Sequence, residues 1–352
     1  MNSLQQRIQL VINRWKEEGT IGYRFFPSGN NNSISDVGGV TVGHSTLDSG
    51  ECQTGVTVIQ PVQDNIYQSP VPCGCAVLNG FAKPVGLVQI EELGVLETPI
   101  VLTNTLCVGR AFSGTVQYMI EQNPDIGRSL PTVNPLVLEC NDGYLNDIQA
   151  LAVSENLVID TLRNTGVKFE RGSVGAGRGM SCFALKGGIG TSSCYVSELN
   201  ATVGVLVLAN FGALSALRLE GLPFGDIIET HLKTDSEQED KGSIIILMAT
   251  DASLDGRQLK RIAKRAGAGL GRLGSYWGHG SGDIAVAFST SGEDKKLRDS
   301  ELELLLRAAA EGTETAVLDA LLQATQVTGF QDHTRYALSD ILQDLYEHNG
   351  VN

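Results

Sequence analysis

The sequence has no excess of positive charge. It contains 26 Lys and Arg residues against 40 Asp and Glu residues, which gives a formal net charge of −14 at pH 7. Nucleic-acid phosphates would be repelled by such a chain, and no basic run offsets the acidic residues. The charge balance therefore argues against a nucleic-acid partner.

Long apolar runs and paired cysteines are also missing. No segment approaches the roughly 20 consecutive apolar residues of a membrane span. Charged residues interrupt the helical apolar pattern of the N-terminal segment, which is unlike a signal peptide. The 7 cysteines are scattered, and Cys73 and Cys75 stand too close in sequence for a zinc or redox pair. We therefore expect buried, reduced thiols in a soluble cytoplasmic protein with no membrane partner.

The composition is that of a globular chain with an ample core. Of the 352 residues, 42% are hydrophobic and 19% are charged, and the 41 glycines predict many tight turns and close backbone approaches. The length allows either one large domain or two smaller ones. No internal repeat is found.

Short β-branched runs fill the middle of the chain, from 37 to about 210. Each has the length of a strand and is bounded by Gly, Pro or Asn. Several are apolar almost throughout, which indicates strands covered on both faces. The runs are GVTVGHS, GVTVIQP, CAVLNGF, PIVLTNT, PLVLECND and TVGVLVLAN. Two further strands are expected in the last third, at 243–249 and 283–290.

Helical spacing of apolar residues predicts helices around these strands. A long helical segment follows 290, with Ser300 and Glu303 as its capping box and a possible division at Gly312. The pattern fits a layered α/β body. The other helices are expected at 4–15, 106–121, 146–164, 256–273 and 337–347. The glycines of Gly269-Leu-Gly271-Arg-Leu-Gly274 have the spacing of a dinucleotide site but follow a helix, so we interpret them as structural.

The Gly242-Ser243 dipeptide stands out by its position. It joins the charged loop 231–241 to the apolar run 243–249. A serine hydroxyl can attack the preceding carbonyl, shift the acyl group from nitrogen to oxygen and so open the chain. The freed α-amine, with an ordinary pKa of about 7.7–8.0, would suit a general base. Taken alone, Gly-Ser before a strand is also typical of a simple turn.

Other polar residues stand at the ends of the predicted strands. Ser281 and Asp283 alternate with His279 in GHGSGD, so in an extended chain they face one side and could orient a nucleophile or an amine. Asn210 ends the run VGVLVLAN and could donate to an oxyanion. A polar cluster, ECNDGY, closes the strand at 135–140. Taken alone, each of these patterns is also typical of a turn.

Taken together, the motifs resemble those of the DmpA-type aminopeptidases, which are self-processing L-aminopeptidase/D-amidase-esterases and β-aminopeptidases. The resemblance covers nearly the whole chain, in the family's order. It is carried by ISDVGGVTVGHSTL, GLVQIEELGVLETPIVLTNT, ECNDGYLND, GSVGAGRGMSCFALKGGIGTSS, VGVLVLANFG, GSIIILMATDASL and GHGSGDIAVAFST. Such a set is far more specific than any one of its members.

The resemblance implies a role for each matching residue. Ser243 matches the serine that becomes the N-terminal nucleophile after cleavage at Gly242. Ser281 and Asp283 match the pair that orients it, although some relatives have glutamate at the second position. Asn210 matches the oxyanion asparagine. On the same comparison, Tyr144 matches a tyrosine at the site, where it would bind substrate or stabilise the oxyanion. Glu139 and Asp142 are candidates for binding the substrate's amine, on charge grounds.

The resemblance also implies a fold and an activity. We expect one domain over 1–352, an αββα four-layer sandwich resembling N-terminal nucleophile hydrolases with DmpA/ornithine acetyltransferase-like connectivity. It would be cut into fragments 1–242 and 243–352, associated as a homo-oligomer. The substrate would be a small peptide, amide or ester, with no metal or cofactor required. Segment 79–89 departs from the D-amidase pattern, so D-alanyl specificity is not implied. The alternatives are an acyltransferase on the same scaffold and a non-catalytic binding relative.

Overall fold

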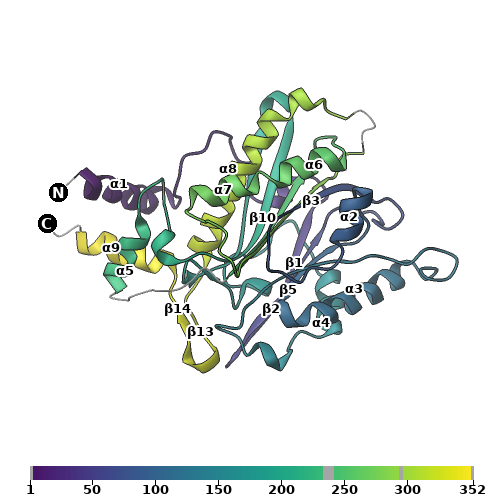
Figure 1. Ribbon diagram of the computed structural model, residues 1–352, viewed down its shortest axis with the longest axis horizontal. Coiled ribbons are helices and arrows are strands. Elements are labelled where there is room, and N and C mark those ends of the chain that lie inside the picture. Colours follow the sequence, from purple (N-terminus) through teal and green to yellow (C-terminus); the bar gives the residue numbers. More distant parts are fainter. Residues whose placement is uncertain (1–2, 233–241, 293–295, 350–352) are drawn as a thin grey trace.

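The computed structural model describes residues 3–232, 242–292 and 296–349. Two main sheets are stacked face to face, and helices cover their outer faces (Figure 1). In the described parts of the chain, no helix is long and apolar enough to cross a membrane.

The larger sheet has six strands. Neighbouring strands are antiparallel except for β11 and β12, which are parallel. Its strands, in spatial order, are β4 (Val95–Leu96), β3 (Val71–Gly80), β12 (Gly282–Ser289), β11 (Ser243–Thr250), β10 (Ala201–Asn210) and β9 (Gly188–Val196). Strands β10, β11 and β12 are buried along their whole length, which confirms the prediction of strands covered on both faces.

The smaller sheet has four strands and faces the larger one across an apolar core. In order, its strands are β1 (Thr41–Ser49), β2 (Cys52–Gln60), β5 (Ile100–Asn104) and β6 (Leu136–Cys140). Ile59, Leu102 and Leu138 from this sheet share one buried cluster with Ile245 and Leu247 of β11. Alternate residues of β11, such as Ile244 and Ile246, point the other way, as the two-residue period of a strand requires.

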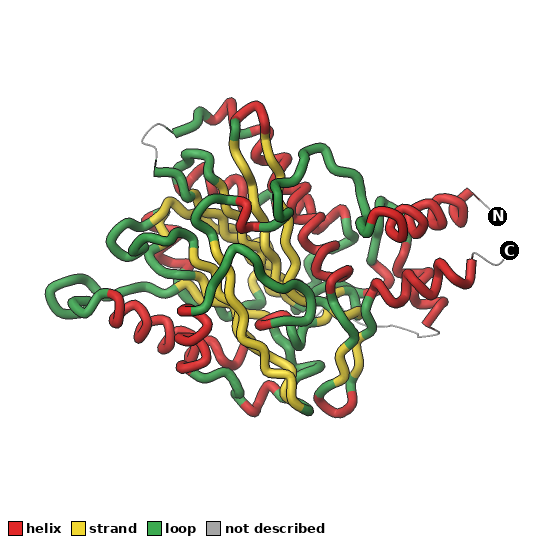
Figure 2. Tube along the Cα trace, turned by 180° about the vertical axis from the view of Figure 1, so that it is seen from behind, coloured by secondary structure: helices red, strands yellow, loops and turns green. Residues whose placement is uncertain are grey.

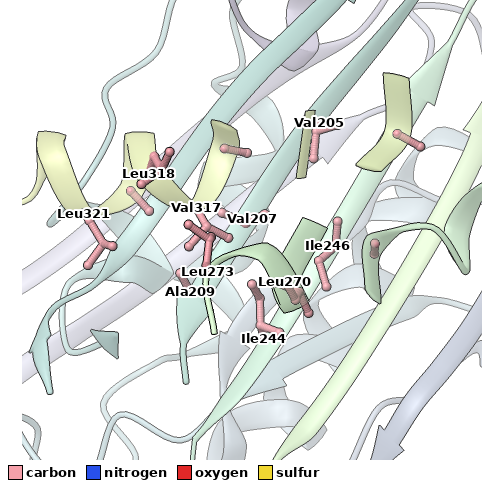
Figure 3. Packing of buried hydrophobic residues seen from close by; sticks show 14 of the residues in the cluster. Val205, Val207, Ala209, Ile244, Ile246, Leu270, Leu273, Val317, Leu318 and Leu321 are labelled. Carbon is pink, nitrogen blue, oxygen red and sulfur yellow. The ribbon is translucent and has the colours of Figure 1, made fainter. Parts of the chain in front are cut away.

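Helices complete the outer layers. α6 (Gly256–Ala263), α7 (Ala266–Arg272) and α8 (Glu303–Gln323) cover the larger sheet. Val317 and Leu321 of α8 share a buried cluster with Val207 and Ala209 of β10, and Figure 3 shows Val317 beside Val207. α3 (Val108–Gln122) and α4 (Glu155–Arg163) cover the smaller sheet. The order helix, sheet, sheet, helix confirms the expected αββα class.

Further helices lie outside these layers. α1 (Ser3–Glu18) and α9 (Leu338–Asn349) lie side by side at one end of the molecule, so the two ends of the described chain are neighbours (Figures 1 and 2). α2 (Leu87–Leu93) packs on β3. α5 (Phe224–Leu232) includes His231, so the expected charged loop 231–241 begins inside a helix. Residues 233–241 of that loop lie outside the described residues. Two short hairpins are also present. In one, β7 (Ser181–Cys182) pairs with β8 (Leu185–Lys186), and in the other, β13 (Val327–Thr328) pairs with β14 (Thr334–Arg335).

The expected helix over 146–164 is wrong in its first half. α4 begins only at Glu155, because the Ser154 hydroxyl accepts the Leu157 N–H at 3.2 Å and caps the helix there. Before it, Ile148–Ala150 forms a single 3-10 turn whose N-terminus is capped by Asp147.

The long C-terminal helices also differ from expectation. The helix over 256–273 is two helices, α6 and α7, which are separated by Lys264 and Arg265. α7 lies close to α8, since a Cβ at Gly269 would lie 2.5 Å from Ala310 O. α8 begins at Glu303. The capping box before it is formed by Arg298 and Glu301, not by Ser300 and Glu303. Gly312 does not divide α8. A Cβ there would lie 2.8 Å from Val205 Cγ2, so the glycine allows the helix to approach β10.

The contact between α8 and β9 generates a stability prediction. A Cβ at Gly190 would lie 2.0 Å from Ala316 O and 2.4 Å from Ala320 N, so Gly190→Ala must push α8 from the sheet. We expect the free energy of unfolding to fall by about 1–3 kcal/mol, as for other overpacked cores. Gly271→Ala is the matched control. It has no heavy atom within 4 Å and lies in α7, so it should raise the free energy by up to about 1 kcal/mol. Urea unfolding measures both, and equal effects would contradict this account.

Candidate active site

The ends of three strands meet at Ser243. It is the first residue of β11, and it pairs with Asn210 at the end of β10 and with Gly282 at the start of β12. Its side chain is buried, and the Gly282 N–H lies 3.3 Å from both Ser243 Oγ and Gly242 O. Space is short before the serine, because a Cβ at Gly242 would lie 2.0 Å from Asn210 O. The site therefore demands glycine immediately before Ser243.

A buried acid and hydroxyl flank Gly282. The Ser281 hydroxyl donates to Asp283 Oδ1 at 2.7 Å, and both residues are 1% exposed. The chain thus holds a carboxylate and a hydroxyl on either side of the residue that touches Ser243 Oγ. His279, which alternates with them in sequence, lies in an exposed turn and does not join the pair. The arrangement suits the binding of a positively charged amine at Ser243.

Asn210 lies on the opposite side of Ser243 from this pair. Its side-chain amide is fixed at both ends: Oδ1 accepts the Ser181 N–H at 2.8 Å, and Nδ2 donates to Asn141 O at 3.0 Å. One Nδ2 proton is used in that contact, and the amide carries a second. A donor held this way can serve an oxyanion without reorganisation.

Glu139 reaches the site from the smaller sheet. It is 2% exposed, and its carboxylate accepts the Lys83 N–H at 2.8 Å and the Thr105 hydroxyl. Burial, followed by the charges of Glu139 and Asp283, raises the pKa of the neighbouring Cys140 thiol. Both carboxylates therefore lie close enough to Cys140 to act on its thiol.

Asp142 is placed differently. It is fully buried, its Oδ2 accepts the Thr54 hydroxyl at 2.5 Å, and its Oδ1 accepts the Asn146 amide at 3.1 Å. Burial raises its pKa from 3.8 to about 6. Both oxygens thus bind protein donors that hold the loop after β6. Asp142 therefore supports this loop, and its binding of the substrate's amine stays a prediction.

Tyr144 lies near the site but is engaged by neighbours. Its ring stacks on His333, with the ring centroids 4.4 Å apart, and the Arg335 guanidinium carbon lies 3.7 Å from the tyrosine ring centroid. Among the described residues, no hydrogen bond joins its hydroxyl to Ser243 or Asn210. Arg335 makes the connection instead, because its Nε donates to Ser181 Oγ at 3.1 Å.

Three residues at the site were not found from the sequence: Ser181, Lys186 and Arg335. Lys186 is fully buried and donates to the carbonyls of Gly177, Met180 and Gly187 at 2.8–2.9 Å, while burial lowers the pKa of its ammonium. It thereby fixes the turn that presents Ser181 to Asn210. Ser181 and Lys186 lie within one of the motifs quoted above, but no local pattern marks any of the three as a site residue.

The fold and this site define a class of protein. The chain superposes on the L-aminopeptidase D-Ala-esterase/amidase of Ochrobactrum anthropi with a TM-score of 0.83 and 31% identity, over 94% of this chain and 97% of that one. That structure is described as a prototype for the serine aminopeptidases and a variant of the Ntn hydrolase fold. The protein is therefore a hydrolase of the N-terminal-nucleophile architecture.

The particular family is settled by the sequence match. The family model of peptidase family S58 matches residues 32–335, so the chain belongs to peptidase family S58. β-Peptidyl aminopeptidase BapA of Sphingosinicella microcystinivorans is 36% identical over 342 residues, which cover 87% of this chain and 85% of that one. The Burkholderia β-aminopeptidase superposes with a TM-score of 0.85 and 34% identity, over 96% of this chain and 99% of that one.

A further solved structure, the PH0078 protein of Pyrococcus horikoshii OT3, superposes with a TM-score of 0.86 and 45% identity, over 95% of this chain and 99% of that one. The comparisons confirm the family and the aminopeptidase function predicted from the sequence. They give no support to an acyltransferase or to a non-catalytic relative.

The raised pKa of Asp142 predicts how stability depends on pH. The unfolded carboxyl titrates near 3.8 and the folded one near 6, so between these values the folded chain holds a proton that the unfolded chain has lost. Stability must therefore fall as pH rises through this window. The comparison is with Asp142→Asn, whose amide does not titrate. As pH rises from 4 to 6.5, the free energy of unfolding of the chain with Asp142 should fall by up to about 3 kcal/mol more than that of the variant, at 1.36 kcal/mol per pKa unit.

Urea unfolding at several pH values measures this difference. Both chains should also carry Ser243→Ala, so that any cleavage before Ser243 cannot complicate the transition. A difference between the two chains that stays constant with pH would show that Asp142 titrates normally.

Proposed function

We propose that Ser243 is the nucleophile of a self-processing aminopeptidase, and that cleavage of the Gly242-Ser243 bond creates it. The observation that carries the proposal is the convergence on Ser243 of a buried Ser281–Asp283 pair on one side and the doubly held Asn210 amide on the other. Nucleophile, orienting groups and oxyanion donor are the components of amide hydrolysis through an acyl-enzyme.

Self-cleavage would begin with attack of Ser243 Oγ on the Gly242 carbonyl carbon. The acyl group moves from nitrogen to oxygen, and water then hydrolyses the ester. The products are a Gly242 carboxylate and a Ser243 with free hydroxyl and α-amine. The Gly282 N–H, 3.3 Å from Gly242 O, stands where a donor to the first oxyanion is needed.

Substrate hydrolysis would use the same atoms again. Ser243 Oγ attacks the scissile carbonyl while its α-amine takes the hydroxyl proton, and Ser281 and Asp283 hold the resulting ammonium. Asn210 stabilises the tetrahedral oxyanion. The proton passes to the departing amine, an acyl-enzyme remains, and water releases the N-terminal amino acid.

Glu139 is the proposed anchor for the substrate's own α- or β-amine. Its carboxylate is buried at the end of β6, and its partner Lys83 N belongs to the loop that follows β3. That loop also touches the residue before β12, because the Phe81 N–H donates to Ser281 O at 3.3 Å. It lies in the segment 79–89 that departs from the D-amidase pattern, so we assign it to the acyl pocket of a small peptide, amide or ester.

The two fragments, 1–242 and 243–352, are proposed to stay together as one domain. β10 and β11 would belong to different fragments, yet they pair from Val203–Thr250 to Asn210–Ser243 and share both apolar cores. The same proposal includes a homo-oligomer of such pairs. A cytoplasmic location is proposed from the cysteines, which are all free among the described residues.

Replacement of the proposed nucleophile gives the most direct test. Ser243→Ala removes both the attacking hydroxyl and the means of cleavage, so it should stay a single chain and hydrolyse no aminoacyl p-nitroanilide. Ser197→Ala, in an exposed turn after β9, should be cut and active like the parent. Intact-mass analysis with N-terminal sequencing of the smaller fragment reads both. Cleavage at Gly242 in the alanine variant would refute the assignment. A panel of L-, D- and β-aminoacyl substrates on the parent chain then defines the acyl class.

Asn210 should affect the chemical step more than substrate binding. Asn210→Asp keeps the shape of the side chain and the acceptor for Ser181 N–H but loses the Nδ2 donor, so kcat should fall about 10²–10³-fold with little change in KM. Asn200→Asp, just before the opposite end of β10, is the matched control and should leave kcat unchanged. Rates are compared only for fully cleaved protein. An Asn210 variant with unaltered kcat would remove this residue from the oxyanion site.

A further inference from the structure

A buried ammonium stands behind the turn that leads to Asn210. Lys186, at the end of β8, is fully buried. Its Nζ donates to three carbonyls at 2.8–2.9 Å, those of Gly177, Met180 and Gly187. Three acceptors at hydrogen-bond distance need three N–H donors, which only the ammonium form of a lysine supplies. The side chain is therefore charged.

A charge in this position is costly and calls for a role. Desolvation by burial, followed by the charge of Arg178, lowers the pKa of the Lys186 ammonium. Within the described parts of the chain, no carboxylate forms an ion pair with it. A carboxylate would neutralise the charge at its source, whereas peptide carbonyls are polarised by the ammonium and transmit its effect to their own N–H groups.

One of the three carbonyls belongs to the peptide group that holds Asn210. Met180 O accepts from Lys186 Nζ at 2.8 Å. The N–H of the same peptide group belongs to Ser181 and donates to Asn210 Oδ1 at 2.8 Å. The Gly187 N–H also donates to Met180 O at 3.0 Å, so both lone pairs of this carbonyl are used. The ammonium is thus joined to the Asn210 side chain through a single peptide group.

The Asn210 amide has one possible orientation in this setting. A backbone N–H faces one end, and Asn141 O lies 3.0 Å from the other, so the first end must be the oxygen and the second the nitrogen. The second Nδ2 proton is available to an oxyanion at Ser243, which pairs with Asn210 across β10 and β11. Lys186, the Met180–Ser181 peptide group and the Asn210 amide therefore form one series of donors that ends beside Ser243.

We infer that Lys186 is a positioning residue of the oxyanion site, whose charge strengthens the Nδ2 donor of Asn210 through the Met180–Ser181 peptide group. The inference rests on the proposed function, in which Asn210 stabilises the oxyanion. Hydrogen bonds in series polarise one another, because an amide whose oxygen accepts a hydrogen bond becomes a better donor through its nitrogen. The ammonium acts on the peptide group, the peptide group acts on Asn210, and the Nδ2 proton gains the positive charge that an oxyanion requires.

Substitution of Lys186 tests the inference in fully cleaved enzyme. A donor worth about 10²–10³ in rate, strengthened by roughly 10–30% at each of two links, predicts that Lys186→Met lowers kcat by about tenfold and leaves KM within about twofold. Methionine retains most of the length and volume of the side chain without its charge. Lys168→Met, which removes an exposed lysine, is the control and should change neither constant.

A double-mutant cycle separates this role from a merely structural one. Asn210→Ala removes the amide that would be polarised, so the addition of Lys186→Met should lower kcat by no more than about twofold further. A full tenfold loss in both backgrounds would show that Lys186 only stabilises the fold, and would overturn the inference. Unaltered kcat in Lys186→Met would also overturn it. Full activity of Asn210→Ala would contradict the proposed oxyanion site itself, and this inference with it.

A second measurement uses the parent chain and needs no variant. Met180-Ser181 is the only Met-Ser dipeptide in the sequence, so ¹³C-carbonyl methionine combined with ¹⁵N-serine marks this one peptide group for NMR. An aminoalkyl boronic acid that forms a tetrahedral anion on Ser243 should move the Ser181 N–H proton resonance downfield. The Lys186 ammonium, observed with ¹⁵Nζ-lysine, should shift with it. The corresponding amino alcohol, which forms no anion, should move neither resonance.

This measurement decides the matter even if Lys186→Met fails to fold or to mature. If either the Ser181 or the Lys186 resonance stays in place when the boronic acid is bound, the two groups are not coupled to the oxyanion and the inference is wrong. Mature parent protein that binds no boronic acid and hydrolyses no substrate would contradict the proposed nucleophile instead.

Discussion

The pairing of β11 with two neighbours of opposite direction positions the rest of the site. β10 runs antiparallel to β11 and β12 runs parallel to it, so the start of β11 meets the end of one strand and the start of the other. All three strands are apolar and buried on both faces, and a slip of one residue would exchange their inward and outward sides. The register of the hydrophobic core thus fixes Ser243 against Asn210 and Gly282.

Close backbone packing is the second constraint. A Cβ at Gly242 would strike Asn210 O, and one at Gly282 would lie 2.5 Å from Phe81 O. Neither glycine leaves room for a side chain, so the backbone packs closely on the β10 side and on the β12 side of Ser243.

The sequence allowed the apolar strands and the residues at their ends to be predicted, because burial on both faces leaves a continuous apolar run that stops where polar chemistry begins. β9 was missed. Its Thr191, Ser192 and Ser193 are fully buried, but their hydroxyls bond to Val205 O, Gly312 O and Asp36. The sequence of this core strand is therefore polar and resembles that of a loop. Ser300 was chosen as a cap for its residue type, whereas the residue before α8 is Leu302, which is fully buried and forms no side-chain cap. Arg335 had no local signal, since it reaches the site only through the β13–β14 hairpin.

The neighbouring positions of α1 and α9 open a different route to the proposed nucleophile. Because the two ends of the described chain lie together, a short linker between them would close the polypeptide into a ring without disturbing either sheet. Opening that ring before Ser243 would yield a circular permutant in which 243–352 is translated ahead of 1–242. Removal of the initiator methionine would then leave serine at the amino terminus from birth. In such a permutant the free α-amine of Ser243 would exist without self-cleavage. The fold therefore allows the reactive amine to be produced independently of cleavage at Gly242.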